Sequence, residues 1–137
     1  MDNDLEKKKV ILQIIPTMEL GGAEAGTLEV STYMKKMGWK VIVASSGGKL
    51  VQKLDFKNIV HIKLPLNSKN PLIMIINIFR IALIINKYKV KIVHARSRAP
   101  AWSSYYACSI FREKIFITTV HGAYKNQNFL KKFYNSI

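Results

Sequence analysis

Residues 14–26 read IIPTMELGGAEAG, and this stretch passes from a short apolar strand through a loop to two adjacent glycines that open a helix. Upstream, VILQIIP at 10–16 is a continuous apolar run of strand length. Downstream, apolar residues recur at helical spacing across 23–37, and Gly38 is typical of the residue that follows a helix. The stretch therefore predicts a strand, a loop and a helix in succession, which is the first half of a βαβ unit.

The same alternation continues along the chain. Apolar, β-branched runs predict further strands at 40–46, 58–65, 90–96 and 114–122. Helices are predicted at about 49–55, from Asn70–Pro71 onward, at 99–111 and from about Asn126. Strands that are apolar on both faces and separated by helices predict a parallel sheet covered on both sides. The expected fold class is therefore α/β, a Rossmann-like doubly wound parallel sheet, with functional groups at the carboxyl ends of its strands.

The most apolar segment is PLIMIINIFRIALII, residues 71–85. Its 15 residues are interrupted by Asn77 and Arg80 and fall short of the roughly 20 that a membrane span needs. On a helix, Asn70, Asn77, Arg80 and Lys87 fall along one narrow stripe. We therefore expect a mostly buried helix with one wet edge and no transmembrane span.

Composition indicates one globular domain: 49% of the 137 residues are hydrophobic and 22% are charged. The net charge of +14 has two interpretations. It attracts anionic lipid, nucleic acid or phosphorylated substrates, or it reflects a lysine-rich composition spread over most polar positions, which is the interpretation we favour. No nucleic-acid-binding motif is found, so no nucleic-acid partner is predicted.

Scattered histidines and the single Cys108 predict no metal site and no internal disulfide, and Cys108 is expected to be an inert, packed thiol.

Gly21 and Gly22 precede a helix N-terminus, where free N–H groups and the helix dipole favour an anion. Two glycines allow a phosphate or a sugar ring to contact the backbone, although a simple tight turn would explain them as well. The spacing matches neither GxGxxG nor a P-loop. Glu24 in the first turn is equally consistent with compensation of the helix dipole.

Two further clusters stand at predicted strand ends. His121 and Gly122 follow the last predicted strand, and His94 has the corresponding position one strand earlier. Arg96 and Arg98 open the next loop. An arginine pair at this edge suits phosphate or carboxylate recognition, or it merely solvates the loop.

Three motifs taken together resemble a known family: GGAE at 21–24, VKIVHARS at 90–97 and TTVHGAY at 118–124. In this order they are similar to the N-terminal half of GT-B glycosyltransferases of the large retaining family 4 type, especially bacterial enzymes that build lipopolysaccharide and other cell-envelope glycans. The resemblance implies two Rossmann-like domains facing across a cleft. The second domain holds most of a nucleotide-sugar, and the first supplies the acceptor surface.

The resemblance also implies roles for individual residues. Gly21 and Gly22, with Glu24 and Gly122 beside them, are expected on the donor diphosphate and sugar side, and His121 is expected to act catalytically on the transferred sugar. The expected acceptor-side residues are His94, Arg96, Ser97 and Arg98. The leaving diphosphate needs positive charge and N–H donors, so no metal and no cofactor beyond the nucleotide-sugar substrate is expected.

The Glu-x7-Glu element of this family is absent, because no acidic residue has another eight positions on. Residues 1–137 are therefore expected to be the acceptor-side domain, inactive without the missing C-terminal domain or a partner subunit. The expected acceptor is a glycan or lipid-linked molecule, and the expected location is the cytoplasm, peripherally at the inner face of the membrane. The alternative is a membrane-associated binding or scaffold subunit of a split enzyme; a nucleotide- or nucleic-acid-binding domain, indicated by charge alone, is weaker.

Overall fold

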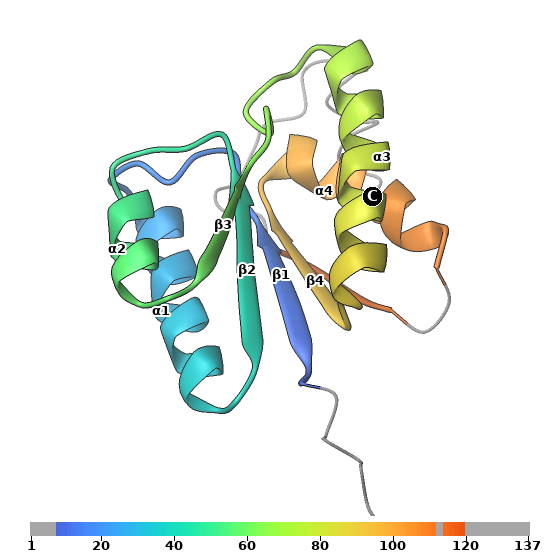
Figure 1. Cartoon of the computed structure of the whole chain (residues 1–137). Helices are drawn as coiled ribbons and strands as arrows, with labels where there is room; N and C mark the ends of the chain where they lie inside the picture. The colour runs from blue at the N-terminus through green and yellow to red at the C-terminus, as the bar shows by residue number, and fades with distance from the viewer. Residues whose placement is uncertain (1–7, 112–113, 120–137) are drawn as a thin grey trace, which may run out of the picture.

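The computed structural model describes residues 8–111 and 114–119, and these form one parallel sheet flanked by helices (Figure 1). The strands are β1 (Val10–Ile14), β2 (Lys40–Ser45), β3 (Val60–Lys63), β4 (Ile92–Arg96) and β5 (Ile115–Thr119). They pair in the order β3-β2-β1-β4-β5, and every pair is parallel. The predicted α/β doubly wound sheet is confirmed.

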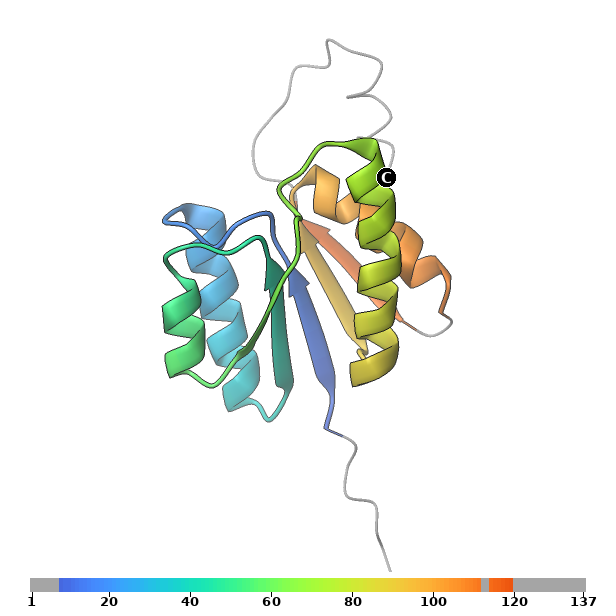
Figure 2. The ribbon, with the colours of Figure 1, turned by 45° about the horizontal axis from the view of Figure 1, so that its top comes forward.

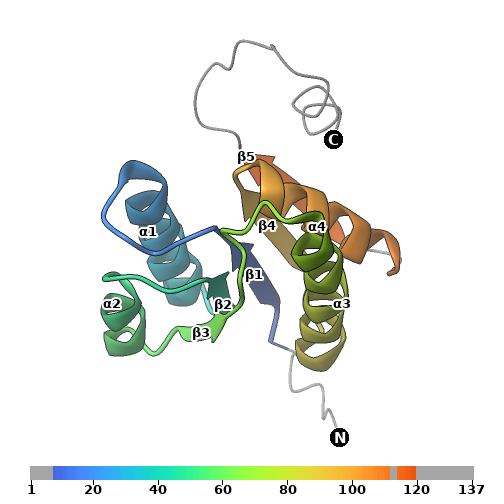
Figure 3. The same ribbon diagram turned by 90° about the horizontal axis from the view of Figure 1, so that it is seen from above.

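The helices cover both faces of the sheet. Helices α1 (Gly22–Lys36) and α2 (Val51–Phe56) lie on one face, and α3 (Pro71–Tyr88) and α4 (Arg98–Ser109) lie on the other (Figures 2 and 3). The strand order reverses between β1 and β4, which are adjacent in the sheet but separated by most of the chain. In open parallel sheets such a reversal leaves a crevice at the carboxyl edge, where ligands bind. The loops after β1 and β4 flank this crevice.

Element boundaries differ from the predicted ones by a few residues, mainly because the strands are shorter. The strand predicted at 58–65 spans only Val60–Lys63, since Leu64 and Pro65 already belong to the following loop. Of the strand predicted at 114–122, the structure describes Ile115–Thr119. The helix predicted from about Asn126 lies outside the described residues.

Strand β1 is buried along its whole length and supplies side chains to two cores. Leu12 and Ile14 join the core beneath α3 and α4, whereas Ile11 and Ile15 join the core beneath α1 and α2. Alternate residues of a strand face opposite sides of a sheet, so an uninterrupted apolar strand is what a doubly covered sheet requires. Cys108 of α4 lies in the first core, which confirms the predicted packing, and burial raises the pKa of its thiol to about 11.

The predicted wet edge of α3 is confirmed for Asn70, Arg80 and Lys87, which are exposed, but wrong for Asn77. Asn77 is 2% exposed, and its Nδ2 donates to the Pro65 carbonyl at 3.2 Å. The helix is also less buried than expected, because it exposes a stripe of large apolar side chains: Leu72, Ile75, Ile76, Phe79 and Leu83. By length and composition alone this 18-residue helix could cross a membrane, with a mean hydropathy of 1.5. In the structure its opposite face, which includes Ile81 and Ile85, is buried in the core beneath α3 and α4.

Candidate functional site

Two loops at the carboxyl edge are held together by backbone hydrogen bonds. Met18 N donates to Gly47 O at 2.8 Å, and Leu50 N donates to Met18 O at 2.7 Å. Gly48 has φ +147°, and a Cβ there would overlap the Met18 carbonyl group and lie 2.6 Å from Glu19 N. Gly48 therefore lets the loop after β2 pack directly against the loop after β1. This contact fixes the chain just before Gly21.

Gly21 and Gly22 are not demanded by the packing around them. Gly21, the N-cap of α1, has an extended backbone with φ −176°, which any residue adopts. A Cβ at Gly21 would meet only the flexible Glu24 carboxylate. A Cβ at Gly22 would have no heavy atom within 4 Å among those compared. The first residue of α1 therefore faces open space, beside the free N–H groups of a 15-residue helix.

Glu24 folds back over this helix end. Its Oε1 accepts a hydrogen bond from Thr17 Oγ1 at 3.4 Å, and its Oε2 lies where a Gly21 Cβ would be. An acid in the first turn is favoured by the helix dipole. Both interpretations of Glu24 stay open, because an incoming anion would have to displace this carboxylate or share the helix end with it.

Arg96, the last residue of β4, belongs to a buried polar cluster beneath α1. Its Nη2 donates to Gln13 Oε1 at 3.2 Å. Gln13 Nε2 donates in turn to Ser31 Oγ at 2.7 Å and to Thr27 O at 3.1 Å. Arg96 is 6% exposed, and burial lowers the pKa of its guanidinium. The cluster joins β4, β1 and α1 at the crevice.

His94 and Ser97 occupy the same edge. The half-buried His94 shares a hydrogen bond with Thr119 through Nε2 and Oγ1, 2.8 Å apart. Ser97 is the N-cap of α4, and its backbone has φ 78° and ψ 159°, a region that non-glycine residues rarely adopt. Arg98 begins α4 and is half-buried. The structure therefore gathers the predicted acceptor-side residues at the end of β4, and their contact with an acceptor stays a prediction.

His121 and Gly122 lie outside the described residues, so their roles stay predictions. The register pairs Arg96 with Thr119, which places the end of β5 beside the end of β4. Within the described part of the chain, no three His, Cys, Asp or Glu side chains gather in a way that could hold a metal ion.

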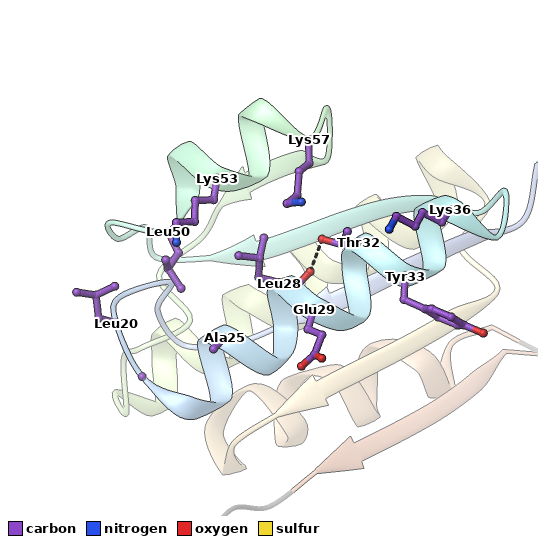
Figure 4. Close-up of a pocket in the computed structure, with 11 residues that line it drawn as sticks. Leu20, Ala25, Leu28, Glu29, Thr32, Tyr33, Lys36, Leu50, Lys53 and Lys57 are labelled. Carbon is purple, nitrogen blue, oxygen red and sulfur yellow. Dashed lines mark hydrogen bonds between the residues drawn. The ribbon is translucent and has the colours of Figure 1, made fainter.

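A groove of about 570 Å³ runs between α1 and α2 and reaches the site at Gly21 (Figure 4). Its lining includes the leucines Leu20, Leu28 and Leu50 and the lysines Lys36, Lys53 and Lys57. Lys35 supports the α2 side by donating to the carbonyls of Lys57 and Asn58, where α2 ends. Among the predicted site residues that the structure describes, Gly21 alone lines this groove.

Sequence reasoning missed Gln13. It is 0% exposed and holds Arg96 in place from the middle of β1. The signal was present, because Gln13 is the one polar residue inside VILQIIP. A buried amide needs partners, so a glutamine in an otherwise apolar strand indicates a polar cluster on that face.

Comparisons with known proteins agree with this geometry. The sequence model of a family described as Glycosyltransferase Family 4 matches residues 20–137. A solved structure of a glycosyltransferase from Rickettsia africae ESF-5 is 50% identical, with a TM-score of 0.79, over 95% of this chain and 34% of its own. The MurG structure from Acinetobacter baumannii has a TM-score of 0.68 at 16% identity, over 94% of this chain and 39% of its own, which shows a common fold. A comparison with curated proteins finds no match. The chain thus spans about a third of the length of these structures.

Proposed function

The chain belongs to Glycosyltransferase Family 4, and from this premise we propose that it is the acceptor-side half of a retaining enzyme that moves a sugar from a nucleotide-sugar to an acceptor. We propose a cell-envelope glycan or a lipid-linked molecule as the acceptor. The remaining catalytic groups would come from a C-terminal domain or a partner subunit, so residues 1–137 alone are expected to be inactive. The proposed location is the cytoplasmic side of the cell membrane.

The observation that carries this proposal is the open space at Gly22. Glycine at the first position of a helix is not the best choice for stability, and no neighbouring atom requires it there. Free N–H groups and the positive end of the dipole surround this space, and both stabilise a diphosphate as its negative charge develops. A ligand that must approach the backbone closely would account for the glycine.

The test is Gly22→Val in a polypeptide that contains this chain together with the rest of the transferase. Valine would fill the space that a diphosphate needs, and its Cβ meets no neighbouring atom within 4 Å among those compared. Donor binding, measured by titration with nucleotide-sugars, should weaken at least tenfold. Gln52→Val, which places the same side chain at an exposed helical position in α2 away from Gly22, is the control. Normal donor affinity in the Gly22 variant would remove this site from the proposal.

His121 is proposed as the catalytic residue that reaches the transferred sugar. His121→Ala should then lower turnover strongly and leave the far-ultraviolet circular dichroism spectrum unchanged. A variant that transfers sugar at the normal rate would exclude His121 from the mechanism without affecting the proposed donor site.

A specific observation favours the alternative, a membrane-associated subunit, either as its own function or as part of the transferase. The apolar stripe of α3, defined by Leu72, Ile75, Ile76, Phe79 and Leu83, is exposed. Helices α3 and α4 contain no Asp or Glu, and their charged residues are Arg80, Lys87 and Arg98. An exposed apolar stripe on helices whose own charges are all positive is complementary to an anionic bilayer.

Sedimentation with vesicles tests this surface. The protein should bind vesicles that contain about 30% phosphatidylglycerol more tightly than pure phosphatidylcholine vesicles, and binding should fall as salt rises. Replacing both Phe79 and Leu83 by serine should weaken binding about tenfold or more, since both side chains leave the bilayer boundary. Phe56→Ser removes a phenylalanine of α2 that is even more exposed than Phe79, and it should leave vesicle binding unchanged. Binding that is absent, or equal in all three proteins, contradicts the membrane surface.

A further inference from the structure

Arg96 carries a buried charge for which no described carboxylate provides compensation. Among the described residues, its guanidinium donates a hydrogen bond to the neutral Gln13 amide, and its buried Nε has no partner there. Buried arginines are normally paired with an acid or a phosphate, because removing the charge from water is costly. Burial lowers the pKa of the Arg96 guanidinium.

The guanidinium is directed beneath the first turns of α1. A Cβ on Gly26 would lie 3.9 Å from Arg96 Nη1, so the charge packs against the helix one turn below Gly22. Gln13 fixes this placement. Its amide nitrogen donates to Thr27 O and Ser31 Oγ of α1, which leaves its oxygen turned toward Arg96.

We propose that Arg96 is a positioning residue whose buried charge sets the affinity of the α1 N-terminus for a diphosphate at Gly22. The proposal rests on the proposed function and replaces direct acceptor contact as the role of Arg96. With 6% of its surface exposed, Arg96 has little area with which to touch a substrate. Its charge acts through the helix instead, where a low dielectric and the absence of a nearby counter-charge preserve its field.

Two features separate this arrangement from an ordinary helix end. Glu24, in the first turn, already offsets the helix dipole in the free protein, so the dipole alone would attract a second anion only weakly. The Arg96 charge adds to the dipole from below without occupying the open space above. Arg96 therefore offsets the charge of Glu24 without filling the open space at Gly22.

Binding of inorganic pyrophosphate to the 137-residue chain tests the proposal, with isothermal calorimetry at low salt as the readout. Arg96→Gln removes the positive charge. Arg96→Lys keeps the charge but replaces the guanidinium group that donates to Gln13. Gly22→Val reports how much of the binding belongs to this site. Arg80→Gln, on an exposed face of α3, removes one charge far from α1 and corrects for the non-specific pull of a protein with a net charge of +14.

We expect Arg96→Gln to weaken pyrophosphate binding about tenfold, the order expected when one positive charge is removed near an anion in a partly buried site. Arg96→Lys should stay within about threefold of the parent protein, and Arg80→Gln within about twofold. Equal losses in the lysine and glutamine variants would overturn the proposal, because the effect would then be one of shape. The proposal is also overturned if Arg96→Gln and Arg80→Gln weaken pyrophosphate binding equally. It is overturned as well if Gly22→Val leaves pyrophosphate binding unchanged.

If Arg96→Gln does not fold, the parent protein still gives an answer by nuclear magnetic resonance. The Arg96 Nε–Hε signal should shift with pyrophosphate in parallel with the Gly22 amide, and an unchanged Arg96 signal would overturn the proposal. Parent protein that binds no pyrophosphate also overturns it. That result leaves the transferase assignment intact, because sugar transfer by the longer polypeptide is measured separately.

Discussion

At the scale of single residues, Gly48 and Gly22 each belong to a Gly-Gly pair at the carboxyl edge of the sheet, but the structure accounts for the two glycines differently. Gly48 combines φ +147° with a backbone neighbour that leaves no room for a Cβ. Gly22 has ordinary helical geometry and open space. The sequence shows two Gly-Gly pairs after two strands and cannot separate these cases. The difference depends on the loop at 16–19, which lies some thirty residues away from Gly48 in the chain.

Gly48→Ala should therefore destabilise the protein by roughly 3 kcal/mol, from the strained backbone and the overlap with Met18 together. Urea unfolding followed by circular dichroism would measure this. Gly22→Ala is the matched control and should be neutral or slightly stabilising, because alanine favours the helix and meets nothing. Similar losses in both variants would contradict the assigned loop contact.

Ser97 presents the reverse case, a non-glycine residue in a conformation suited to glycine. Its hydroxyl makes no capping hydrogen bond to α4, so the side chain offers no local compensation for φ 78°. Ser97→Gly should raise the free energy of unfolding by about 1 kcal/mol, the relief of strain less the entropy that glycine adds to the unfolded chain. Ser97→Ala keeps the strain and should not stabilise. If Ser97→Gly stabilises and also weakens acceptor binding, the strain serves the predicted acceptor site.

At the scale of elements, strands β2 and β3 are joined by a polar pair inside the sheet. Ser45 Oγ and His61 Nε2 lie 2.7 Å apart, and the half-buried His61 has a lowered pKa. Burial is the main cause; Asp55 opposes it by raising the pKa, and Lys63 adds to it. Because the folded pKa lies below the unfolded one, the unfolded state binds the proton first as pH falls.

The contribution of His61 to the free energy of unfolding should consequently be fully present above its unfolded pKa of about 6.5. It should decline as pH falls through and below that value. Thermal unfolding of the parent protein and of His61→Gln, compared from pH 7.5 to pH 5, isolates the contribution of His61 from that of the carboxylates. The difference between their melting temperatures should be constant above pH 7 and should move in favour of the variant below pH 6.5. A difference that does not change with pH would show that His61 titrates normally.

The strands and helices could be predicted because each requirement is local. Apolar runs of five to seven residues, Pro71 at a helix start and Gly38 after a helix end each indicate one boundary. The orientation of α3 could not be predicted this way. That helix is apolar on nearly every side, so its four polar residues defined a stripe but not which side faced the sheet. Asn77 is buried because the Pro65 carbonyl, in the loop before the helix, accepts its hydrogen bond.

At the scale of the whole molecule, the charge distribution appears only once the helices are assigned to faces. Lysines are spread along the sequence, which favoured a compositional interpretation of the +14 charge. The acids are not spread in the same way. Glu24, Glu29 and Asp55 belong to the α1 and α2 layer, and helices α3 and α4 contain no acidic residue. One layer of the fold therefore has positive charges with no negative neighbours of its own.

Self-repulsion in that layer should limit stability at low ionic strength. Raising NaCl from about 0.02 M to 0.3 M shortens the Debye length from about 20 Å to about 6 Å, so the melting temperature should rise by several degrees. Replacing Lys69 and Lys91, both exposed in the acid-free layer, by glutamine should raise the low-salt melting temperature and flatten the salt dependence. Replacing Lys49 and Lys53, which share their side of the molecule with Glu19 and Asp55, removes the same charge and should do less. Equal effects in the two double variants would mean that net charge alone, and not its segregation, governs the repulsion.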